Sequence, residues 1–354
     1  MTFSYKFPAV RGVQAGKEYY VSMVPLNVLS KLFSSDTDDV VSPEFRAQRR
    51  LNESRIPTIR KYIINNRDSY VFSALSASID GKFAFLPYDG QSDIGILEID
   101  MDTTFLINDG QHRKAAIEEA LKEDGTLGEE TISVVFFEDK GLERSQQMFT
   151  DLNKHAVKSS NSIATLYDSR DNLAVATKTV ISQIPFLNQF TDKEKDNLGK
   201  NSSKLFTLNN IYKANKRIIK GSEVTESDRQ FLLNFWNSVV SNIIEWQELM
   251  SKEIAKSDLR QNYILCLNIT IAAFGKVGAY FYSNPQINMS KTLEKLRKVN
   301  WSRSNMKDWE GRAIDSKGKV VSNELAIDLV SNRIKQLLGI RLSEEEVQKE
   351  DSFK

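Results

Sequence analysis

The pattern of apolar residues changes near residue 160, and this change constrains the fold more than any other feature of the sequence. Before residue 160, short apolar runs typical of strands alternate with helical patterns. The strand-like segments are 19–24, 70–79, 83–86, 104–107 and 132–137, and the helical ones are 55–65, 111–122 and 142–152. After residue 160, strands are hard to find and long helical patterns cover 227–256, 259–282 and 323–338. The sequence therefore predicts an α+β protein, in which an N-terminal α/β domain is followed by a mostly α-helical domain.

The length of 354 residues suits about two domains. A polar stretch at 155–165 reads as a linker, so we expect a first domain over 1–158 and a helical domain over 159–342. The last residues, 343–354, are strongly charged, and we expect them to form a frayed tail.

The charge is balanced overall but unevenly distributed. Lys and Arg together number 48 against 47 Asp and Glu, which excludes a uniformly basic protein that coats a polyanion. Three segments are locally basic: 41–67 has seven basic and two acidic residues, 200–220 has six and none, and 291–307 has six and one. Such segments can neutralise DNA phosphates, although each can also be an ordinary solvated surface.

Nine basic residues in these segments are the candidate DNA contacts. They are Arg46, Arg49, Arg50, Arg55, Lys213, Lys216, Arg217, Lys298 and Arg303. The segment 208–219 can form a recognition helix that presents Asn209, Asn210 and Asn215 to a groove, or it can be a common surface helix. Trp301 and Trp309 can stack on bases, although Trp more often anchors a core.

The chemistry-bearing residues are few. Two His and one Cys are too few for a zinc finger or ribbon, and no metal site is predicted. Cys266 lies in an apolar run and is expected to be buried. The N-terminus lacks the apolar core of a signal peptide, and the longest apolar stretch, 269–281, contains Lys276 and is too short to span a bilayer. We therefore expect a cytoplasmic protein with no membrane partner.

The most informative stretch runs from a strand through Asp-Gly-Gln-His-Arg into a helix. The first-turn amides of a helix have no internal partners and lie at the positive end of the helix dipole, and Gly110 lets an anion approach them. Arg113 can grip a phosphate with two donors, and His112 can donate to it. Asp109 can cap the helix or coordinate a nucleotide-bound metal. The plain alternative is that Asp109 is only a cap, Gly110 only a turn and Arg113 only a solvated side chain.

The run Gly110-Gln-His-Arg-Lys-Ala-Ala116 resembles the Gly-x-x-Arg-x-x-Ala box of the ParB/sulfiredoxin-like fold, which binds nucleotide phosphates in ParB proteins. The string Asp109 to Arg113 resembles the DGQHR-domain family. With the stretches 7–16, 45–57, 70–81 and 148–153, the first 160 residues resemble the DndB family, the regulatory component of DNA phosphorothioation (dnd) systems. The resemblance is much weaker in the helical half.

This resemblance implies a DNA-binding transcriptional repressor of a dnd operon, whose product replaces a phosphate oxygen of DNA by sulfur. The implied partners are double-stranded operator DNA, a second copy of the chain in a homodimer, and other dnd proteins. It also implies a phosphate or nucleotide site formed by Asp109, Gly110, Gln111, His112 and Arg113, which Asn153 would complete.

The alternative is an enzyme that hydrolyses ATP or CTP with Mg²⁺, or nicks DNA, in support of sulfur modification. Its catalytic candidates are Asp109, which would hold Mg²⁺, and His112, which would orient water, while Arg113 would stabilise charge. Sulfiredoxins have Cys at the position of Gln111, so we expect no sulfinic-acid repair at this box. The chain also lacks a P-loop.

Overall fold

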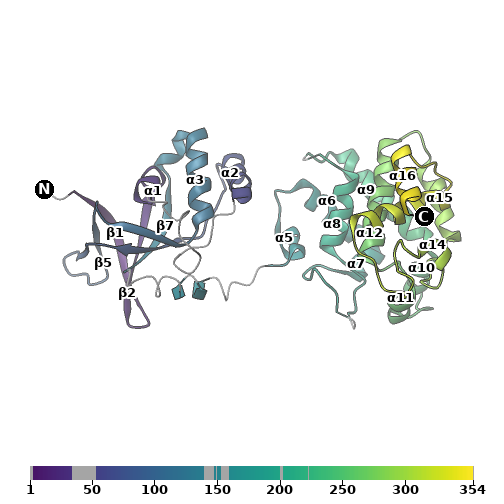
Figure 1. The fold of residues 1–354 in the computed structure, drawn as a ribbon, viewed down its shortest axis with the longest axis horizontal. Coiled ribbons are helices and arrows are strands. Elements are labelled where there is room, and N and C mark those ends of the chain that lie inside the picture. The colour runs from purple at the N-terminus through teal and green to yellow at the C-terminus, as the bar shows by residue number, and fades with distance from the viewer. Residues whose placement is uncertain are drawn as a thin grey trace. The chain divides into compact units, whose positions relative to one another are not determined.

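The computed structural model describes residues 3–33, 53–138, 147–148, 150–152, 159–199, 202–221 and 223–353. The chain divides into two compact units, Met1–Val157 and Lys158–Lys354. The first unit contains a mixed sheet with helices and the second is largely helical (Figure 1). The α+β class expected from the sequence is confirmed at this level.

The first unit is built on a seven-stranded sheet in the order β4-β5-β1-β2-β7-β3-β6. The strands are β1 (Ser4–Gln14), β2 (Lys17–Pro25), β3 (Leu75–Asp80), β4 (Phe83–Pro87), β5 (Ile94–Asp100), β6 (Thr104–Asp109) and β7 (Thr131–Glu138). All neighbouring strands pair antiparallel except β3 and β7, which are parallel. Strands β3 and β7 are neighbours in the sheet but are separated in the chain by β4, β5, β6 and a helix, and β6 lies at the edge of the sheet beside β3.

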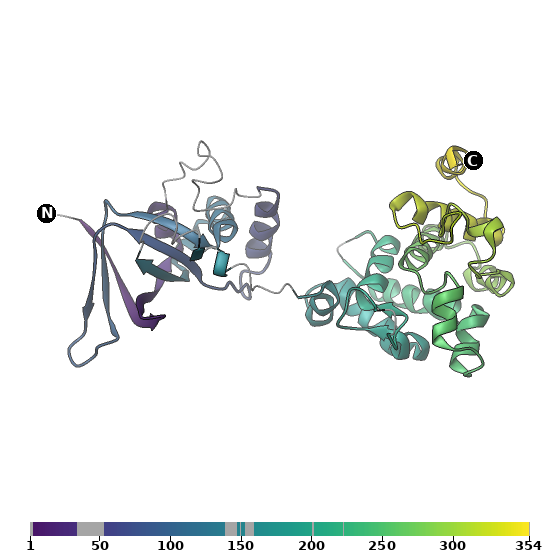
Figure 2. The same ribbon diagram turned by 60° about the horizontal axis from the view of Figure 1, so that its bottom comes forward.

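Apolar residues alternate along these strands and form the core of the first unit. Phe7 and Ala9 of β1 and Val134 and Phe136 of β7 are buried, whereas Val10, which follows Ala9 and points to the other face, is half exposed. The helices that complete this unit are α1 (Leu26–Leu32), α2 (Ile56–Asn65) and α3 (Gln111–Glu123), with 3₁₀ turns at Glu53–Arg55 and Gly125–Glu129. These three helices group together beside the sheet (Figure 2).

Two predictions for the first unit need adjustment. The strand expected over 70–79 begins only at Leu75, because the carbonyls of Ser73 and Ala74 accept hydrogen bonds from Arg113 instead of joining the sheet. Of the helix expected over 142–152, residues 147–148 and 150–152 are described, and they are helical.

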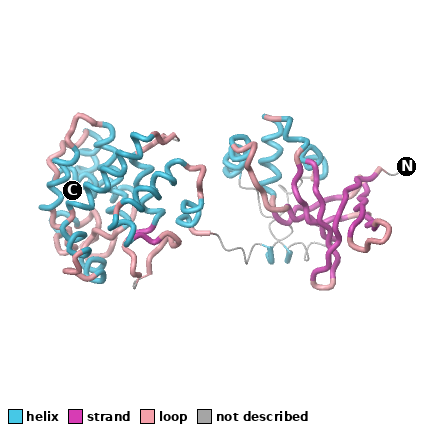
Figure 3. Tube along the Cα trace, turned by 180° about the vertical axis from the view of Figure 1, so that it is seen from behind, coloured by secondary structure: helices cyan, strands magenta, loops and turns pink. Residues whose placement is uncertain are grey.

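The second unit packs short and medium helices around one core (Figure 3). The longer helices are α6 (Asn172–Gln183), α8 (Leu208–Ile218), α9 (Glu226–Asn242), α12 (Asn268–Ser283), α15 (Glu324–Leu337) and α16 (Glu344–Phe353). The shorter ones are α5 (Asn161–Tyr167), α7 (Pro185–Phe190), α10 (Ile244–Met250), α11 (Lys256–Asn262), α13 (Met289–Leu293), α14 (Met306–Trp309) and the 3₁₀ helix η5 (Glu294–Lys298). Two short strands, β8 (Thr191–Asp192) and β9 (Phe206–Thr207), pair in parallel.

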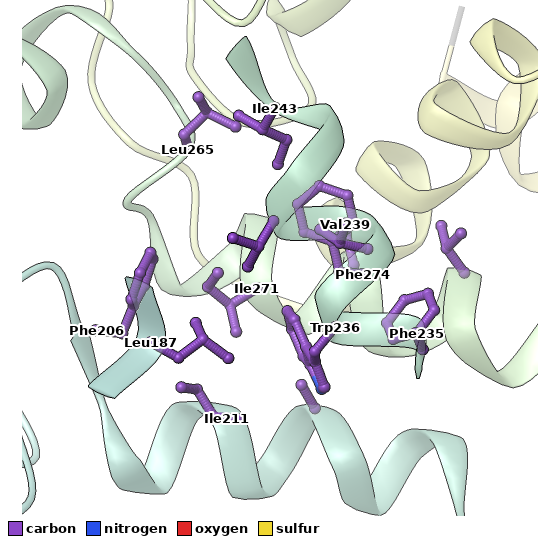
Figure 4. Packing of buried hydrophobic residues seen from close by; sticks show 14 of the residues in the cluster. Leu187, Phe206, Ile211, Phe235, Trp236, Val239, Ile243, Leu265, Ile271 and Phe274 are labelled. Carbon is purple, nitrogen blue, oxygen red and sulfur yellow. The ribbon is translucent and has the colours of Figure 1, made fainter. Parts of the chain in front are cut away.

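All four tryptophans of the chain are fully buried in this unit. Trp236 lies among residues of several helices and the neighbouring segments (Figure 4), and Trp301 stacks on Trp309 with ring centroids 5.4 Å apart. Trp236, Val239, Val240 and Ile243 recur at helical spacing and are all buried, so they form a packing face of the helical unit. The idea that Trp301 and Trp309 stack on bases is wrong, because neither ring is exposed.

A glycine allows the central helices α8 and α12 to touch. A Cβ on Gly275 would lie 2.6 Å from the carbonyl oxygen of Ala214, which is shorter than any tolerated contact. The backbones therefore approach each other more closely than a side chain at position 275 permits, and α8 is held rigidly on the core.

The two long helices predicted between 227 and 282 are each interrupted. Ile243 adopts an extended conformation between α9 and α10, and the side chain of Gln247 donates to the carbonyl of Val240, at 2.7 Å. Between α11 and α12, Tyr263 forms a β-bridge with Ser302, and Ile264 donates to the carbonyl of Trp301. These tertiary hydrogen bonds outweigh the local preference for helix.

The frayed tail expected over 343–354 is instead helix α16. Glu350 is buried and forms an ion pair of 2.5 Å with Arg312, while Lys349 pairs with Asp328 at 3.1 Å. The charged side chains that suggested a solvated tail instead form ion pairs that attach this helix to the rest of the helical unit.

Candidate nucleic-acid interface

The junction of β6 and α3 contains a glycine that no other residue can replace without strain. Gly110 has φ of +106° and is the N-cap of α3. A Cβ on it would lie 2.3 Å from Cδ2 of Leu75. The turn therefore requires glycine both for its backbone conformation and for space, and it leaves the helix start without a capping side chain.

Arg113 joins this helix start to the segment before β3. Its Nη1 donates to the carbonyls of Ser73 at 2.7 Å and Ala74 at 2.9 Å, and also to the hydroxyl of Ser73. Its Nη2 donates to Oδ2 of Asp109, at 2.7 Å. The guanidinium side chain is 16% exposed, so Arg113 is an integral part of the fold at this position.

The carboxylate of Asp109 accepts a hydrogen bond from Arg113. It does not cap helix α3, which was one of the two expectations for this residue. Its carboxylate is 45% exposed and stands directly against the guanidinium, in the place that a bound anion would take. Gln111 and His112 occupy the first turn of α3 and are partly buried. Lys114 is buried and pairs with Glu118 at 3.1 Å. Five of the six predicted members of this site lie together because they are consecutive in sequence: Asp109, Gly110, Gln111, His112 and Arg113. Of these, Arg113 and Asp109 are in direct contact.

Met148, from the stretch 148–153 that contributes to the family resemblance, lies next to the strand that leads into this box. Asn108 is buried, and its Nδ2 donates to Oγ of Ser78 at 2.8 Å and to Sδ of Met148 at 3.1 Å. Its Oδ1 has no hydrogen-bond partner among the described residues. Met148 therefore lies against β6, while Asn153 lies outside the described residues.

The basic residues of segment 41–67 are divided between described and undescribed parts. Arg46, Arg49 and Arg50 lie outside the described residues, and Arg55 is exposed. Arg60 pairs with Glu123, and Arg67 pairs with Glu130 at 2.8 Å and Asp124 at 3.1 Å. These last two side chains link α2 and its C-terminal loop to the end of α3 and the turn beyond it.

Helix α8 has one buried face and one lysine face. Leu208, Ile211, Ala214 and Ile218 are buried at helical spacing. On the solvent side, Lys213, Lys216 and Lys220 are exposed, and none has a carboxylate partner in the part of the chain that the structure describes. Lys213 and Lys216 are three residues apart on α8 and therefore lie on one side of the helix, and Lys220 follows two residues beyond its last residue, Ile218. We call these three exposed lysines the lysine face of α8. Lys220 was not among the candidates.

The asparagines of α8 do not face solvent as a recognition helix would require. Asn215 is fully buried, donates to Oγ1 of Thr177 at 2.9 Å and accepts from Nε1 of Trp236 at 2.7 Å. Asn209 is buried, and Asn210 donates to the side chain of Asn268. The prediction that α8 presents its asparagines to a DNA groove is therefore wrong for Asn209 and Asn215, which are buried in the helical unit, whereas Asn210 is partly exposed.

The remaining candidates differ in their surroundings. Lys298 is exposed at the end of η5, without an ion-pair partner in the described ranges. Arg217 is bound to Glu324 of α15. Arg303 donates to the carbonyls of Tyr263 at 3.2 Å and Arg260 at 3.0 Å, and burial lowers its pKa.

Three further findings bear on the chemistry. No group of three or more His, Cys, Asp or Glu that could hold a metal ion is found among the described residues. Burial raises the pKa of the partly exposed Cys266 to about 12, as expected for a core thiol. Across the described ranges, no helix combines the length and apolar character needed to cross a membrane.

The comparisons with known proteins give one match. A family model described as "DndB: DNA-sulfur modification-associated" matches residues 7–341, which includes both units. Comparisons with curated proteins and with solved structures gave no match. The match extends the resemblance seen in the first 160 residues over nearly the whole chain.

Proposed function

The chain belongs to the DndB family, and from this premise we propose that it is a DNA-binding transcriptional regulator that represses a DNA sulfur modification (dnd) operon. In this proposal it acts in the cytoplasm on double-stranded operator DNA, as a homodimer and in contact with other dnd proteins. Paired half-sites on an operator are commonly read by two copies of one chain.

The observation that carries the proposal is the lysine face of α8. Lys213, Lys216 and Lys220 are exposed, close together in the chain and not neutralised by a described carboxylate. Because cations of this kind release counterions when they meet DNA phosphates, such a face binds duplex with a strong dependence on salt. Lys298 and Arg55, which are also exposed, are proposed as further phosphate contacts.

Helix α8 is proposed to contact phosphates and not base edges. Its asparagines are engaged inside the unit, and lysine ammonium groups on a helix surface position a duplex without reading it. Arg217 and Arg303 already bind groups of the protein, so their part in DNA binding requires that those contacts be exchanged. Arg46, Arg49 and Arg50 remain proposed DNA contacts of the first unit.

The DGQHR box is proposed as a phosphate or nucleotide site that modulates DNA binding. We propose for the first unit a ParB/sulfiredoxin-like fold, in which Asp109, Gly110, Gln111, His112, Arg113 and Asn153 surround the phosphate of ATP or CTP with Mg²⁺. A phosphate at Arg113 would have to displace the carboxylate of Asp109 from Nη2. Asp109→Asn should therefore tighten nucleotide binding in equilibrium dialysis, since the competing charge is gone, and unchanged binding argues against this site.

The proposal is tested by a mobility-shift titration with the promoter of the chain's own operon and with random duplex, at several salt concentrations. We expect tighter binding to the promoter at physiological salt. The triple variant Lys213→Ala/Lys216→Ala/Lys220→Ala should lose about two units or more of the slope of log K against log salt, because each phosphate contact contributes about 0.9.

Lys317→Ala is the control, because Lys317 is exposed in the same unit but lies on the loop after α14. It should leave the slope almost unchanged. Equal binding to promoter and random duplex by the unaltered protein would exclude an operator-specific repressor, and an unchanged slope in the triple variant would exclude the lysine face.

A further inference from the structure

A cavity of about 300 Å³ lies in the helical unit, bordered by α5, α6, the segment after β8 and the start of α8. Its size is at the lower end of the range for small-ligand sites. Apolar side chains and two lysines share its lining, which includes Leu166, Lys178, Thr179, Ile181, Lys193 and Leu208. The cavity is separate from the DGQHR box, which belongs to the first unit.

The two lysines of the cavity are held only by neutral acceptors. Nζ of Lys178 donates to the carbonyls of Leu166 at 3.0 Å and Asp168 at 2.6 Å, at the C-terminal end of α5. Nζ of Lys193 lies 3.3 Å from Oδ1 of Asn188. Neither ammonium group forms an ion pair with any described carboxylate, so two positive charges border the cavity without a counter-charge of their own.

Two acidic residues close in sequence, Asp168 and Asp192, accept hydrogen bonds from backbone amides of turns. Oδ1 of Asp168 accepts from the amides of Arg170 and Asp171, and Oδ1 of Asp192 accepts from those of Glu194 and Lys195. These carboxylates are therefore fixed as turn caps, and the ammonium groups of Lys178 and Lys193 can bind an external anion.

The lining favours an anion with one polar and one apolar side. An oxygen that faces Ile181 and Leu208 would lose its hydrogen bonds to water without replacement, which is costly. Sulfur is a weak hydrogen-bond acceptor and loses much less there. A phosphodiester with one non-bridging oxygen replaced by sulfur has both features, because its remaining oxygen can meet an ammonium while its sulfur meets the apolar wall.

We propose that this cavity binds a thio-substituted phosphodiester, which makes the helical unit a sensor of the product of DNA sulfur modification. The inference rests on the proposed function, since it names the signal to which the regulator responds. It places that signal at Lys178 and Lys193 and not at the lysine face of α8.

The test uses the full chain and two thymidine dinucleotides, one with a phosphorothioate linkage, as separated diastereomers, and one with an ordinary phosphate linkage. Calorimetric titration should show one thio diastereomer binding at least about tenfold more tightly than the phosphate dinucleotide. Lys193→Ala and Lys178→Gln should each weaken that binding about fivefold or more. Lys195→Ala should not, because Lys195 is exposed two residues away and does not line the cavity.

Equal binding of the sulfur and oxygen dinucleotides overturns the proposal, and so does an equal effect of Lys193→Ala and Lys195→Ala. Thermal melts of each variant identify loss of folding, and Lys193→Met then provides a second test that keeps the aliphatic part of the side chain. The dinucleotides are too short to require the lysine face of α8. If the dinucleotides do not bind as expected while promoter binding still depends on Lys213 and Lys216, the sensor proposal is overturned and the repressor proposal stands.

Discussion

Arg217 of α8 and Glu324 of α15 form a two-pronged ion pair, with Nη1 to Oε1 at 2.6 Å and Nη2 to Oε2 at 2.9 Å. This pairing lowers the pKa of Glu324, and Lys276 approaches the same carboxylate at 3.4 Å. The helix that presents the lysine face thus has one of its cations neutralised from a neighbouring helix.

Glu324→Gln should strengthen DNA binding, because it leaves Arg217 and Lys276 with one carboxylate fewer. We expect about a two- to fivefold gain in affinity at low salt and a slope of log K against log salt that is steeper by up to about one unit. Mobility-shift titrations at several salt concentrations measure both. The stability of the unit should change little, because the pair is partly exposed.

Glu223→Gln is the matched control, since it removes the same charge from an exposed position with no ion pair among the described residues. If both variants gain equally in DNA affinity, the effect is one of net charge. If neither variant binds DNA more tightly, Arg217 does not contribute to the DNA surface.

Gly275→Ala should destabilise the helical unit by about 1–3 kcal/mol, because the added Cβ would meet the carbonyl oxygen of Ala214 at 2.6 Å and must push α8 away from α12. The four tryptophans are all in this unit, so their fluorescence reports its unfolding alone. The melting temperature should fall by about 3–8 °C.

Gly221→Ala is the control for this steric argument. A Cβ there meets no atom closer than 3.6 Å, so its melting curve should match that of the unaltered protein. A similar fall in melting temperature in both variants would show that replacing a glycine is destabilising at either position. The contact of α8 with α12 would then not be the cause.

The sequence predicts those elements whose signal is local. Strands β2, β4, β6 and β7 and helices α2, α3 and α15 follow from alternation or helical spacing within a few residues. Strand β1 is not predicted, because Pro8 and Gly12 interrupt its pattern, and it forms through long-range pairs such as Phe7 with Leu97. The breaks at Ile243 and Tyr263 likewise depend on hydrogen bonds from distant side chains and backbone.

The candidate site shows the same division. The glycine turn and the position of Arg113 on α3 are predictable, because strand, turn and helix signals adjoin there. The partners of Arg113 at Ser73 and Ala74, about 40 residues away, are not. Neither is the burial of Asn215, because the sequence cannot tell which face of α8 meets Trp236.

Arg113→Ala should loosen the segment before β3, because the carbonyls of Ser73 and Ala74 lose their donor. We expect a cost of about 2–3 kcal/mol to the first unit. Hydrogen exchange should become faster across residues 70–76 while the helical unit keeps its protection. Asp109→Asn retains both carbonyl contacts and should have a much smaller effect, so equal exchange in the two variants would contradict this structural role of Arg113.

Cys266 should be nearly inert toward thiol reagents in the folded protein. Its pKa of about 12 leaves only about one thiol in ten thousand as thiolate at pH 8, and the rate should rise about tenfold for each unit of pH while the protein stays folded. Unfolding in guanidinium removes the burial that raises this pKa and should make the reaction fast at pH 8. Absorbance assays with an aromatic disulfide in the two states measure the contrast, and a rapid reaction of the folded protein at pH 7 would show that the thiol is accessible and ionised.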